Sequence, residues 1–299
     1  MITTLDQIVD RVKGATAKRL AVAVAEDPHT IEAVGRAVKE KLVHAVLTGD
    51  KNAIKKVADE AKVDPGQFEI VHEPDKAKAL ALAIASVRAG EADFLMKGLL
   101  DSSVYIRGLI DKEKGLLPPG KLMSHVSVIQ VPAWKKLIIC GDVAVIPAPD
   151  LEAKVAILNY AIDVAHKLGI DKPKAVLLSA VEKVNPKMPS TTEAAIIAKM
   201  AERGQIKGAL VDGPLALDVA FSAESARIKG IASPAAGDAD ILVFPNIESG
   251  NIFFKACTYL AKGELAAVVA GAKCPCVLTS RSDSEDSKFY SIALGSLLA

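Results

Sequence analysis

The sequence predicts an α/β protein in which mainly parallel sheets are covered by helices. From about residue 20, short β-rich runs alternate with amphipathic helical patterns, which is typical of consecutive βαβ units. One pair of neighbouring runs near the middle of the chain instead resembles an antiparallel hairpin. The 299 residues, 51 % of them apolar, are enough for one large domain or two of ordinary size.

The first part of the chain repeats the alternation regularly. An amphipathic pattern over residues 1–14 predicts a surface helix before the first strand. Strands are expected at residues 19–25, 44–47, 68–71 and 93–96. Helices are expected at residues 30–42, 52–62, 75–89 and 104–111. Asp75 opens the third of these helices and is expected to cap it, because a carboxylate accepts hydrogen bonds from the first free N–H groups.

The rhythm changes after residue 122. Two extended runs, residues 123–131 and 137–146, are joined by a short segment that starts at Pro132, and they predict a hairpin. Pro147 and Pro149 follow, and they mark a boundary between two α/β units. The alternation then resumes. Helices are expected at residues 150–168, 191–203, 218–229, 250–262 and 286–298. Strands are expected at residues 175–179, 208–211, 241–244, 266–269 and 276–278.

Composition excludes several classes of partner. The formal net charge is +1, so the chain as a whole has no electrostatic footprint for nucleic acid or an anionic membrane. No apolar run approaches the roughly 18 residues that a membrane span requires. Without a secretory pattern at the N-terminus, we expect a cytoplasmic protein whose cysteines are reduced. The four cysteines are Cys140, Cys257, Cys274 and Cys276.

Several chemical motifs are missing from the sequence. It contains no P-loop, no glycine-rich dinucleotide fingerprint after the first strand and no G-x-S-x-G elbow. The five histidines are scattered and form no pair with metal-ligand spacing. His125, beside Ser124 in an expected strand, is the histidine of most interest.

Polar residues follow five of the expected strands. In open parallel sheets, ligands bind beyond the carboxyl ends of the strands. Any one such group can be a simple cap, but five together, two of them with cations, indicate an anionic ligand on that face. These groups are Lys97 with Gly98, Ser179, Asp212 with Gly213 and Pro214, Ser249 with Asn251, and Ser280 with Arg281 and Asp283.

The pair Ser280–Arg281 is the sharpest of these signals, because a guanidinium offers phosphate a planar fork of donors. Asp283 and Asp286 lie near the start of the last helix. They can equally be capping and first-turn acids that favour the helix dipole. Arg107 lies on the helix after Lys97, where it can either face a ligand or simply be solvated.

Five ordered segments resemble the phosphate acetyl/butyryltransferase family, from about residue 90 to the end of the chain. The segment that begins at Ser179 is more similar to the butyryl branch. The matching segments are residues 96–101, 179–193, 212–218, 237–240 with 249–251, and 278–283 with 290–294.

The resemblance implies an isocitrate/isopropylmalate-dehydrogenase-like fold with two α/β domains and an interdomain cleft. Residues 1–148 with 276–299 would form domain I, and residues 149–275 would form an inserted domain II. It also implies a homodimer or larger homo-oligomer that acts in short-chain fatty acid metabolism. Coenzyme A would be a substrate, and neither a metal nor a nicotinamide would be needed.

The implied reaction converts butyryl-CoA and phosphate to butyryl phosphate and CoA by direct transfer in a ternary complex. Ser280 and Arg281 match the family's Ser–Arg pair, and Arg107 resembles its phosphate-side arginine. Asp283 and Asp286 both stay candidates for the base, because alignment onto the last helix needs a gap. The other residues that we expect to bind substrate are Lys97, Gly98, Ser124, Asp212, Gly213, Pro214 and Asn251.

Three alternatives stay open. One is an acetyl-specific enzyme of the same fold, since one methylene decides only about 1–3 kcal/mol. Another is a non-catalytic, regulatory CoA-binding protein. The third is a metal- and NAD-dependent decarboxylating dehydrogenase, which would need clustered aspartates. The aspartates available to it are Asp212, Asp218, Asp238 and Asp240.

Overall fold

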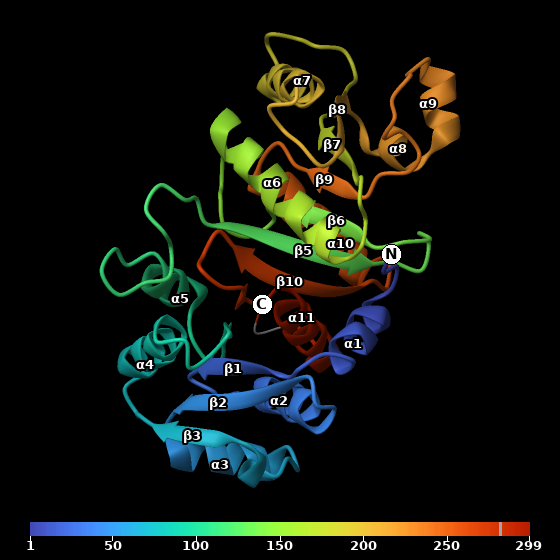
Figure 1. Cartoon of the computed structure of the whole chain (residues 1–299). Coiled ribbons are helices and arrows are strands. Elements are labelled where there is room, and N and C mark those ends of the chain that lie inside the picture. The colour runs from blue at the N-terminus through green and yellow to red at the C-terminus, as the bar shows by residue number, and fades with distance from the viewer. Residues whose placement is uncertain (281–282) are drawn as a thin grey trace. The chain divides into compact units, whose positions relative to one another are not determined.

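The computed structural model describes residues 1–280 and 283–299 and divides into two compact units (Figure 1). The terminal unit contains Leu5–Met123 and Leu265–Ala299, and the central unit contains Met1–Thr4 and Ser124–Glu264. These boundaries differ from those expected at residues 148 and 275. The hairpin after residue 123 belongs to the central unit, because its second strand pairs with a strand of that unit.

The terminal unit contains six neighbouring strands in the order β3–β2–β1–β4–β11–β10. All pairs are parallel except β10 with β11, an antiparallel pair that the alternation did not predict. The strands are β1 (Lys18–Ala23), β2 (Val43–Gly49), β3 (Glu69–His72), β4 (Phe94–Lys97), β10 (Glu264–Ala270) and β11 (Cys276–Val277).

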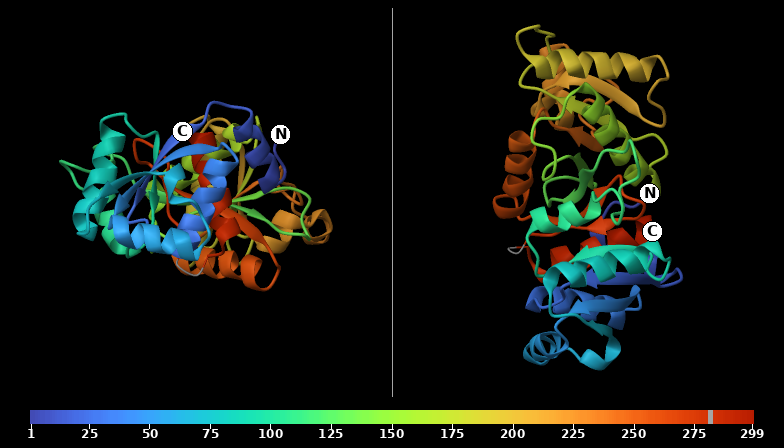
Figure 2. Two further views of the ribbon diagram at one scale, coloured as in Figure 1. Left: turned by 90° about the horizontal axis from the view of Figure 1, so that it is seen from below. Right: turned by 90° about the vertical axis from the view of Figure 1, so that its left-hand side faces the viewer.

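Helices cover both faces of this sheet (Figures 1 and 2). α1, α2, α3 and α11 lie on one face, and α4 and α5 lie on the other. Right-handed crossovers require this division, because the chain moves outward from β1 to β3 and then returns to β4. The helices are α1 (Leu5–Lys13), α2 (Pro28–Lys39), α3 (Lys51–Glu60), α4 (Lys76–Arg88), α5 (Ser102–Leu109) and α11 (Glu285–Leu298), with a short 3₁₀ turn at Pro65–Gln67.

Aspartate side chains cap three of these α-helices. Asp27, Asp50 and Asp75 have extended backbones, and each carboxylate accepts at least one N–H of the following turn. The prediction that Asp75 caps α4 is therefore confirmed, with bonds of 2.9 and 3.0 Å from Ala77 and Lys78.

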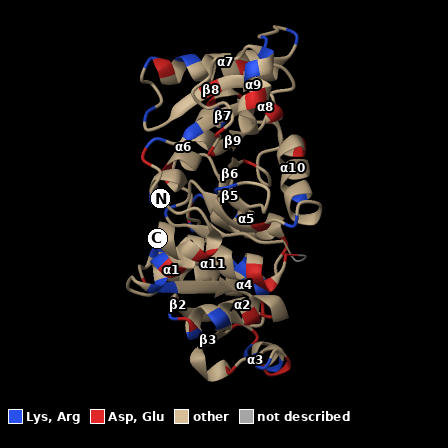
Figure 3. Cartoon of the chain, turned by 90° about the vertical axis from the view of Figure 1, so that its right-hand side faces the viewer, with Lys and Arg blue, Asp and Glu red and all other residues tan. Residues whose placement is uncertain are grey.

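The central unit contains five neighbouring strands in the order β5–β6–β9–β7–β8. The hairpin prediction is confirmed, because β5 and β6 are antiparallel, whereas β6, β9, β7 and β8 are parallel. The strands are β5 (Ser124–Gln130), β6 (Ile138–Gly141), β7 (Lys174–Leu178), β8 (Leu210–Leu215) and β9 (Ile241–Val243). α6 (Leu151–Lys167) and α7 (Pro189–Glu202) lie on one face, and α8 (Leu217–Phe221), α9 (Ala223–Lys229) and α10 (Ile247–Tyr259) lie on the other (Figures 1 and 3).

Two sequence expectations are wrong in the central unit. Asp212, Gly213 and Pro214 lie inside β8 and not after its end. β8 is the last strand in the order, and proline is tolerated in an edge strand because the ladder there is open on one side. The single helix expected at residues 218–229 is two helices, since Ser222 ends α8 and its side chain caps α9.

The surface helices carry both signs of charge. Figure 3 shows basic and acidic residues interspersed along α2, α7 and α9. Among the helices of the described residues, none is long and apolar enough to cross a membrane. The expected α/β fold, with mainly parallel strands covered by helices, is confirmed.

Candidate functional site

The turn after β4 is built around Lys97 and Gly98. The Lys97 side chain is 4 % exposed, and its ammonium donates to the carbonyl of Leu100 at 3.0 Å. A Cβ added at Gly98 would lie 2.1 Å from the carbonyl oxygen of Val24, so only glycine fits there. Val24 itself has φ +58°, in the left-handed region. Two segments that follow neighbouring strands are thus pressed together.

Arg107 lies in the last turn of α5 and is exposed. Gly108, the next residue, permits α5 to pack closely on α4, since an added Cβ would lie 2.9 Å from Leu80. The helix is thereby fixed by its other face. Because Gly108, and not Arg107, makes the close contact with α4, the Arg107 side chain is available to bind a ligand.

Ser280 and Asp283 follow β11 and are bonded to each other. The N–H of Ser280 donates to Oδ2 of Asp283 at 2.7 Å, and the N–H of Asp283 donates to the Ser280 carbonyl at 3.2 Å. Arg281, the expected phosphate ligand between them, lies outside the described residues. Ser284 begins α11 as its N-cap, so neither Asp283 nor Asp286 is the N-cap of this helix.

Asp286 is bound to an arginine that the sequence reading did not single out. Nη1 of Arg36 on α2 donates to Oδ1 of Asp286 at 2.7 Å, and the guanidinium lies 3.7 Å from the ring centre of Phe289. Nε of Arg36 also donates to Glu40 at 3.0 Å. Burial lowers the pKa of Arg36, but the bonds to Asp286 and Glu40 outweigh it and raise that pKa overall. The first turn of α11 is thereby tied to α2.

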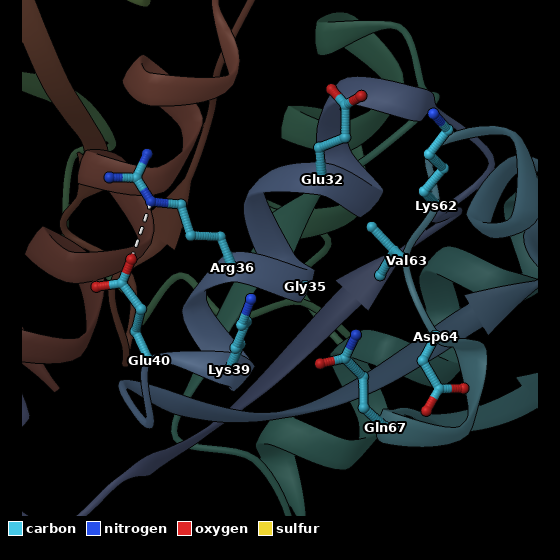
Figure 4. A pocket seen from close by; sticks show the side chains of 9 residues that line it. All are labelled: Glu32, Gly35, Arg36, Lys39, Glu40, Lys62, Val63, Asp64 and Gln67. Carbon is cyan, nitrogen blue, oxygen red and sulfur yellow. Dashed lines mark hydrogen bonds and ion pairs between the residues drawn. The ribbon is translucent and has the colours of Figure 1, made fainter.

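The same arginine borders a cavity of about 770 Å³ between α2 and the segment that leads to β3 (Figure 4). Its polar walls contain equal numbers of basic and acidic side chains. Because neither sign dominates, this cavity does not favour an anionic ligand. The charged residues are Arg36, Lys39, Lys62, Glu32, Glu40 and Asp64.

Lys288 is a further residue that sequence reasoning missed. It lies in the second turn of α11 and is 2 % exposed. Its ammonium donates to the carbonyls of Ser280 at 3.0 Å and Asp283 at 3.3 Å. The available signal was its position in a helix that is apolar on several sides, because such a helix offers a lysine little solvent-exposed surface.

Within the terminal unit, two of the groups predicted from the sequence follow the carboxyl ends of neighbouring strands. β4 and β11 are parallel neighbours, with Met96 opposite Val277. Lys97 directly follows Met96, and the segment after Val277 leads to Ser280. Polar groups after two adjacent parallel strands form the kind of crevice in which α/β proteins bind ligands.

The central unit holds the other expected residues. Ser124, fully buried at the start of β5, donates to Oδ2 of Asp142 at 3.1 Å. Asp142 accepts three further bonds, from the N–H groups of His125, Ala144 and Val145. These contacts give Ser124 a structural role in joining the two strands of the hairpin.

Asp212, Gly213 and Pro214 lie together in β8, whereas Asn251 lies on α10 of the same unit. Oδ1 of Asp212 accepts the N–H of Gly213 at 2.8 Å. A Cβ at Gly213 would lie 2.7 Å from Cβ of Leu177, so close packing of β8 on β7 requires glycine. Asn251, on α10, donates to the carbonyl of Val143 at 3.1 Å.

Three of the aspartates considered for a metal-dependent dehydrogenase are bound to lysines. Asp218 contacts Lys229, and Asp240 contacts Lys136 at 2.6 Å. Asp238 contacts three lysines, which are Lys135, Lys136 and Lys174. Over residues 1–280 and 283–299, no three His, Cys, Asp or Glu side chains form a group that could hold a metal ion.

Comparison with protein families gives a match over nearly the whole chain. The model described as phosphate acetyl/butaryl transferase matches residues 3–83 and 76–296. A phosphate butyryltransferase of Clostridium acetobutylicum is 44 % identical over 299 residues, which cover 100 % of this chain and 99 % of the relative. A phosphate acetyltransferase of Thermotoga maritima is also 44 % identical, over 295 residues and 99 % of both chains.

A solved structure shows the same fold. A branched-chain phosphotransacylase from Enterococcus faecalis V583 is 32 % identical, with a TM-score of 0.82 over 94 % of this chain and 98 % of the other. The relatives thus share one type of reaction and differ in the acyl group that their names give.

Proposed function

The chain belongs to the phosphate acetyl/butyryl transferase family, and we propose that within this family it transfers butyryl groups between coenzyme A and phosphate. Phosphate acyl transfer itself follows from membership. The butyryl preference is supported by full-length similarity to butyryltransferases and by the segment that begins at Ser179. The acetyltransferase of equal identity makes acetyl the rival acyl group.

The observation that carries the proposed site is that β4 and β11 are parallel neighbours, so their carboxyl ends lie side by side. It places the turn of Lys97 and Gly98 beside the segment that leads to Ser280. The buried ammonium of Lys97 and the hydroxyl of Ser280 both follow the carboxyl ends of these strands. Hydrogen-bond donors at this position suit a reaction whose substrates and products carry phosphate oxygens.

In the proposed mechanism, Arg281 and Arg107 hold phosphate, which attacks the thioester carbonyl in the ternary complex. The C–S bond then breaks, and CoA leaves as a thiolate that takes up a proton from a protonated carboxyl. The Ser280 hydroxyl hydrogen-bonds the oxyanion that develops, and one such donor is worth about 10²–10³ in rate. In the reverse direction the thiol of CoA attacks the acyl phosphate, and a carboxylate accepts its proton. Direct transfer relies on orientation of the two substrates, not on a covalent enzyme intermediate.

Asp283 and Asp286 are the candidates for this base, and their surroundings differ. The Arg36 guanidinium donates to the Asp286 carboxylate at 2.7 Å, so this carboxylate is engaged by another side chain as long as the pair persists. Asp283 is bonded through Oδ2 to a neutral N–H. We propose that Asp286 must exchange Arg36 for substrate if it is the base, whereas Asp283 needs no such exchange.

The test is phosphate-dependent release of free thiol from butyryl-CoA and acetyl-CoA. Arg107→Ala should raise the KM for phosphate by about 10–100-fold without loss of stability, because Arg107 is exposed. Arg11→Ala, an exposed arginine in the last turn of α1, is the matched control and should behave as the wild type. If neither acyl-CoA releases thiol in a phosphate-dependent way, the enzymatic proposal is wrong. If acetyl-CoA is much the better substrate, the butyryl preference is wrong.

The expected assembly and domain roles are proposals as well. We propose a homodimer or larger homo-oligomer, which light scattering on the purified protein can check. We also propose that residues of the central unit bind substrate, and the expected ones are Ser124, Asp212, Gly213, Pro214 and Asn251.

A further inference from the structure

The position of Lys288 is unusual for a lysine. Its side chain is 2 % exposed, although its helix begins at the surface with the half-exposed Asp286. Lysine is almost never fully buried unless its ammonium is paired. Within the described part of the chain, no carboxylate oxygen lies within 4.0 Å of that ammonium, and its partners are two backbone carbonyls.

Those carbonyls belong to the two residues that carry the candidate chemistry. The ammonium lies 3.0 Å from the carbonyl oxygen of Ser280 and 3.3 Å from that of Asp283. One cation therefore holds both ends of the segment that presents the Ser280 hydroxyl and the Asp283 carboxylate. Charge-assisted bonds of this kind are stronger than neutral ones, so the segment depends on the charge of Lys288.

The groups around Lys288 have opposite effects on the charge of its ammonium. Burial lowers the pKa of Lys288, and the negative charges of Asp27 and Asp283 oppose that fall. Asp27 lies at the start of α2, which packs against α11. The other charged groups near the first turn of α11 are Arg36, Glu285 and Asp286, and these are paired with one another.

We propose that Lys288 is a positioning residue for acyl transfer, and that its ammonium fixes Ser280 and Asp283 in the orientation that the reaction requires. This inference rests on the proposed function. Lys288 touches neither substrate, so its effect should appear in kcat more than in the KM for phosphate. Neutralisation of its ammonium at alkaline pH should release the two carbonyls.

The experiment compares Lys288→Met, Lys288→Arg and the wild type in thiol release between pH 6 and 10. Lys288→Met should lower kcat by about 10–100-fold, because small misplacements of reacting groups cost rates of this order. Lys288→Arg keeps a permanent charge and should recover most of that loss. The wild type should lose kcat as this ammonium is neutralised at alkaline pH, and Lys288→Arg should remove that fall.

Lys154→Met is the control for the removal of a buried lysine from a helix. Lys154 lies on α6 and is 6 % exposed, but its partner is Glu193, on α7 of the central unit. This variant should lose stability and keep the pH profile of the wild type. A purely structural role for Lys288 would give the same pattern.

The proposal is overturned if folded Lys288→Met keeps kcat within about twofold of the wild type. It is also overturned if Lys288→Arg shows the same alkaline fall as the wild type. Hydrogen exchange supplies a readout without activity, since the N–H groups of Ser280 and Asp283 should exchange faster in Lys288→Met. If the wild type itself releases no thiol, the proposed function fails, and exchange still decides whether Lys288 holds this segment.

Discussion

Replacement of Gly98 by alanine is the most direct test of how the turn after β4 is built. The added Cβ would lie 2.1 Å from the carbonyl oxygen of Val24 and 2.8 Å from its carbonyl carbon. Real Cβ atoms essentially never approach other heavy atoms within 3.0 Å, so a backbone segment must move by about 0.9 Å or more. The same carbonyl accepts the N–H of Leu99 at 2.7 Å, and this bond must lengthen with the movement.

The cost follows from these two effects. Overpacking against a fixed backbone costs about 1–3 kcal/mol, and a weakened hydrogen bond adds about 1 kcal/mol. We expect Gly98→Ala to lower the free energy of unfolding by about 2–4 kcal/mol, a large share of the usual 5–15 kcal/mol. Activity should also fall, because Lys97 is displaced together with the turn.

The assay is urea unfolding followed by far-UV circular dichroism at pH 7. Gly14→Ala is the matched control, because its Cβ would lie no closer than 3.7 Å to another atom. That variant should change stability by less than about 0.5 kcal/mol. The steric argument is refuted if Gly98→Ala unfolds at the wild-type urea concentration, or if Gly14→Ala loses as much stability.

Three further predictions concern contacts away from this turn. Burial raises the pKa of Asp238, but bonds from Lys174 and two neighbouring lysines lower it more, so this group stabilises the fold above its ordinary pKa of about 4. Asp238→Asn should therefore lose about 1–2 kcal/mol at pH 7, and the difference from the wild type should shrink as pH falls below about 4; an equal loss at pH 2.5 would contradict this. Arg36→Ala should lower the melting temperature by several degrees, because α2 loses its bonds to α11; an unchanged value would show that these ion pairs contribute nothing. Ser124→Ala should cost about 1 kcal/mol in chemical unfolding through its lost bond to Asp142, and an unchanged midpoint would remove the structural role.

Much of the fold could be predicted from the sequence, because hydrophobic periodicity determines which segments form strands and helices. The order of elements, the hairpin and the cap at Asp75 are examples. Pairing between distant segments leaves no such local signal. The antiparallel pairing of β11 with β10 depends on which strands meet in space. The placement of Asp212 inside β8 was missed for a related reason, since Gly213 and Pro214 resemble a turn when they are read locally.

The candidate site was predictable only in part. Ser280 and Lys97 could be found because polar residues after apolar strands are visible along the chain. Their proximity depends on β4 and β11 being neighbours, although about 180 residues separate them. Arg36 and Lys288 were missed because both lie on helices, where a cation is usually solvated. Only the folded structure shows that Arg36 bonds Asp286 across the contact of α2 with α11, and that Lys288 bonds the carbonyl of Ser280.

The terminal unit is discontinuous in sequence, and this has a consequence for its synthesis. A ribosome that has completed Glu264 has delivered every residue of the central unit. The terminal unit at that moment still lacks β11, which belongs beside β4, and α11, which covers α1 and α2. Because domains fold as units during translation, the central unit should mature first on the emerging chain. The segment with Ser280 follows Glu264 in the chain, so the candidate site is assembled only after the whole central unit has been synthesised.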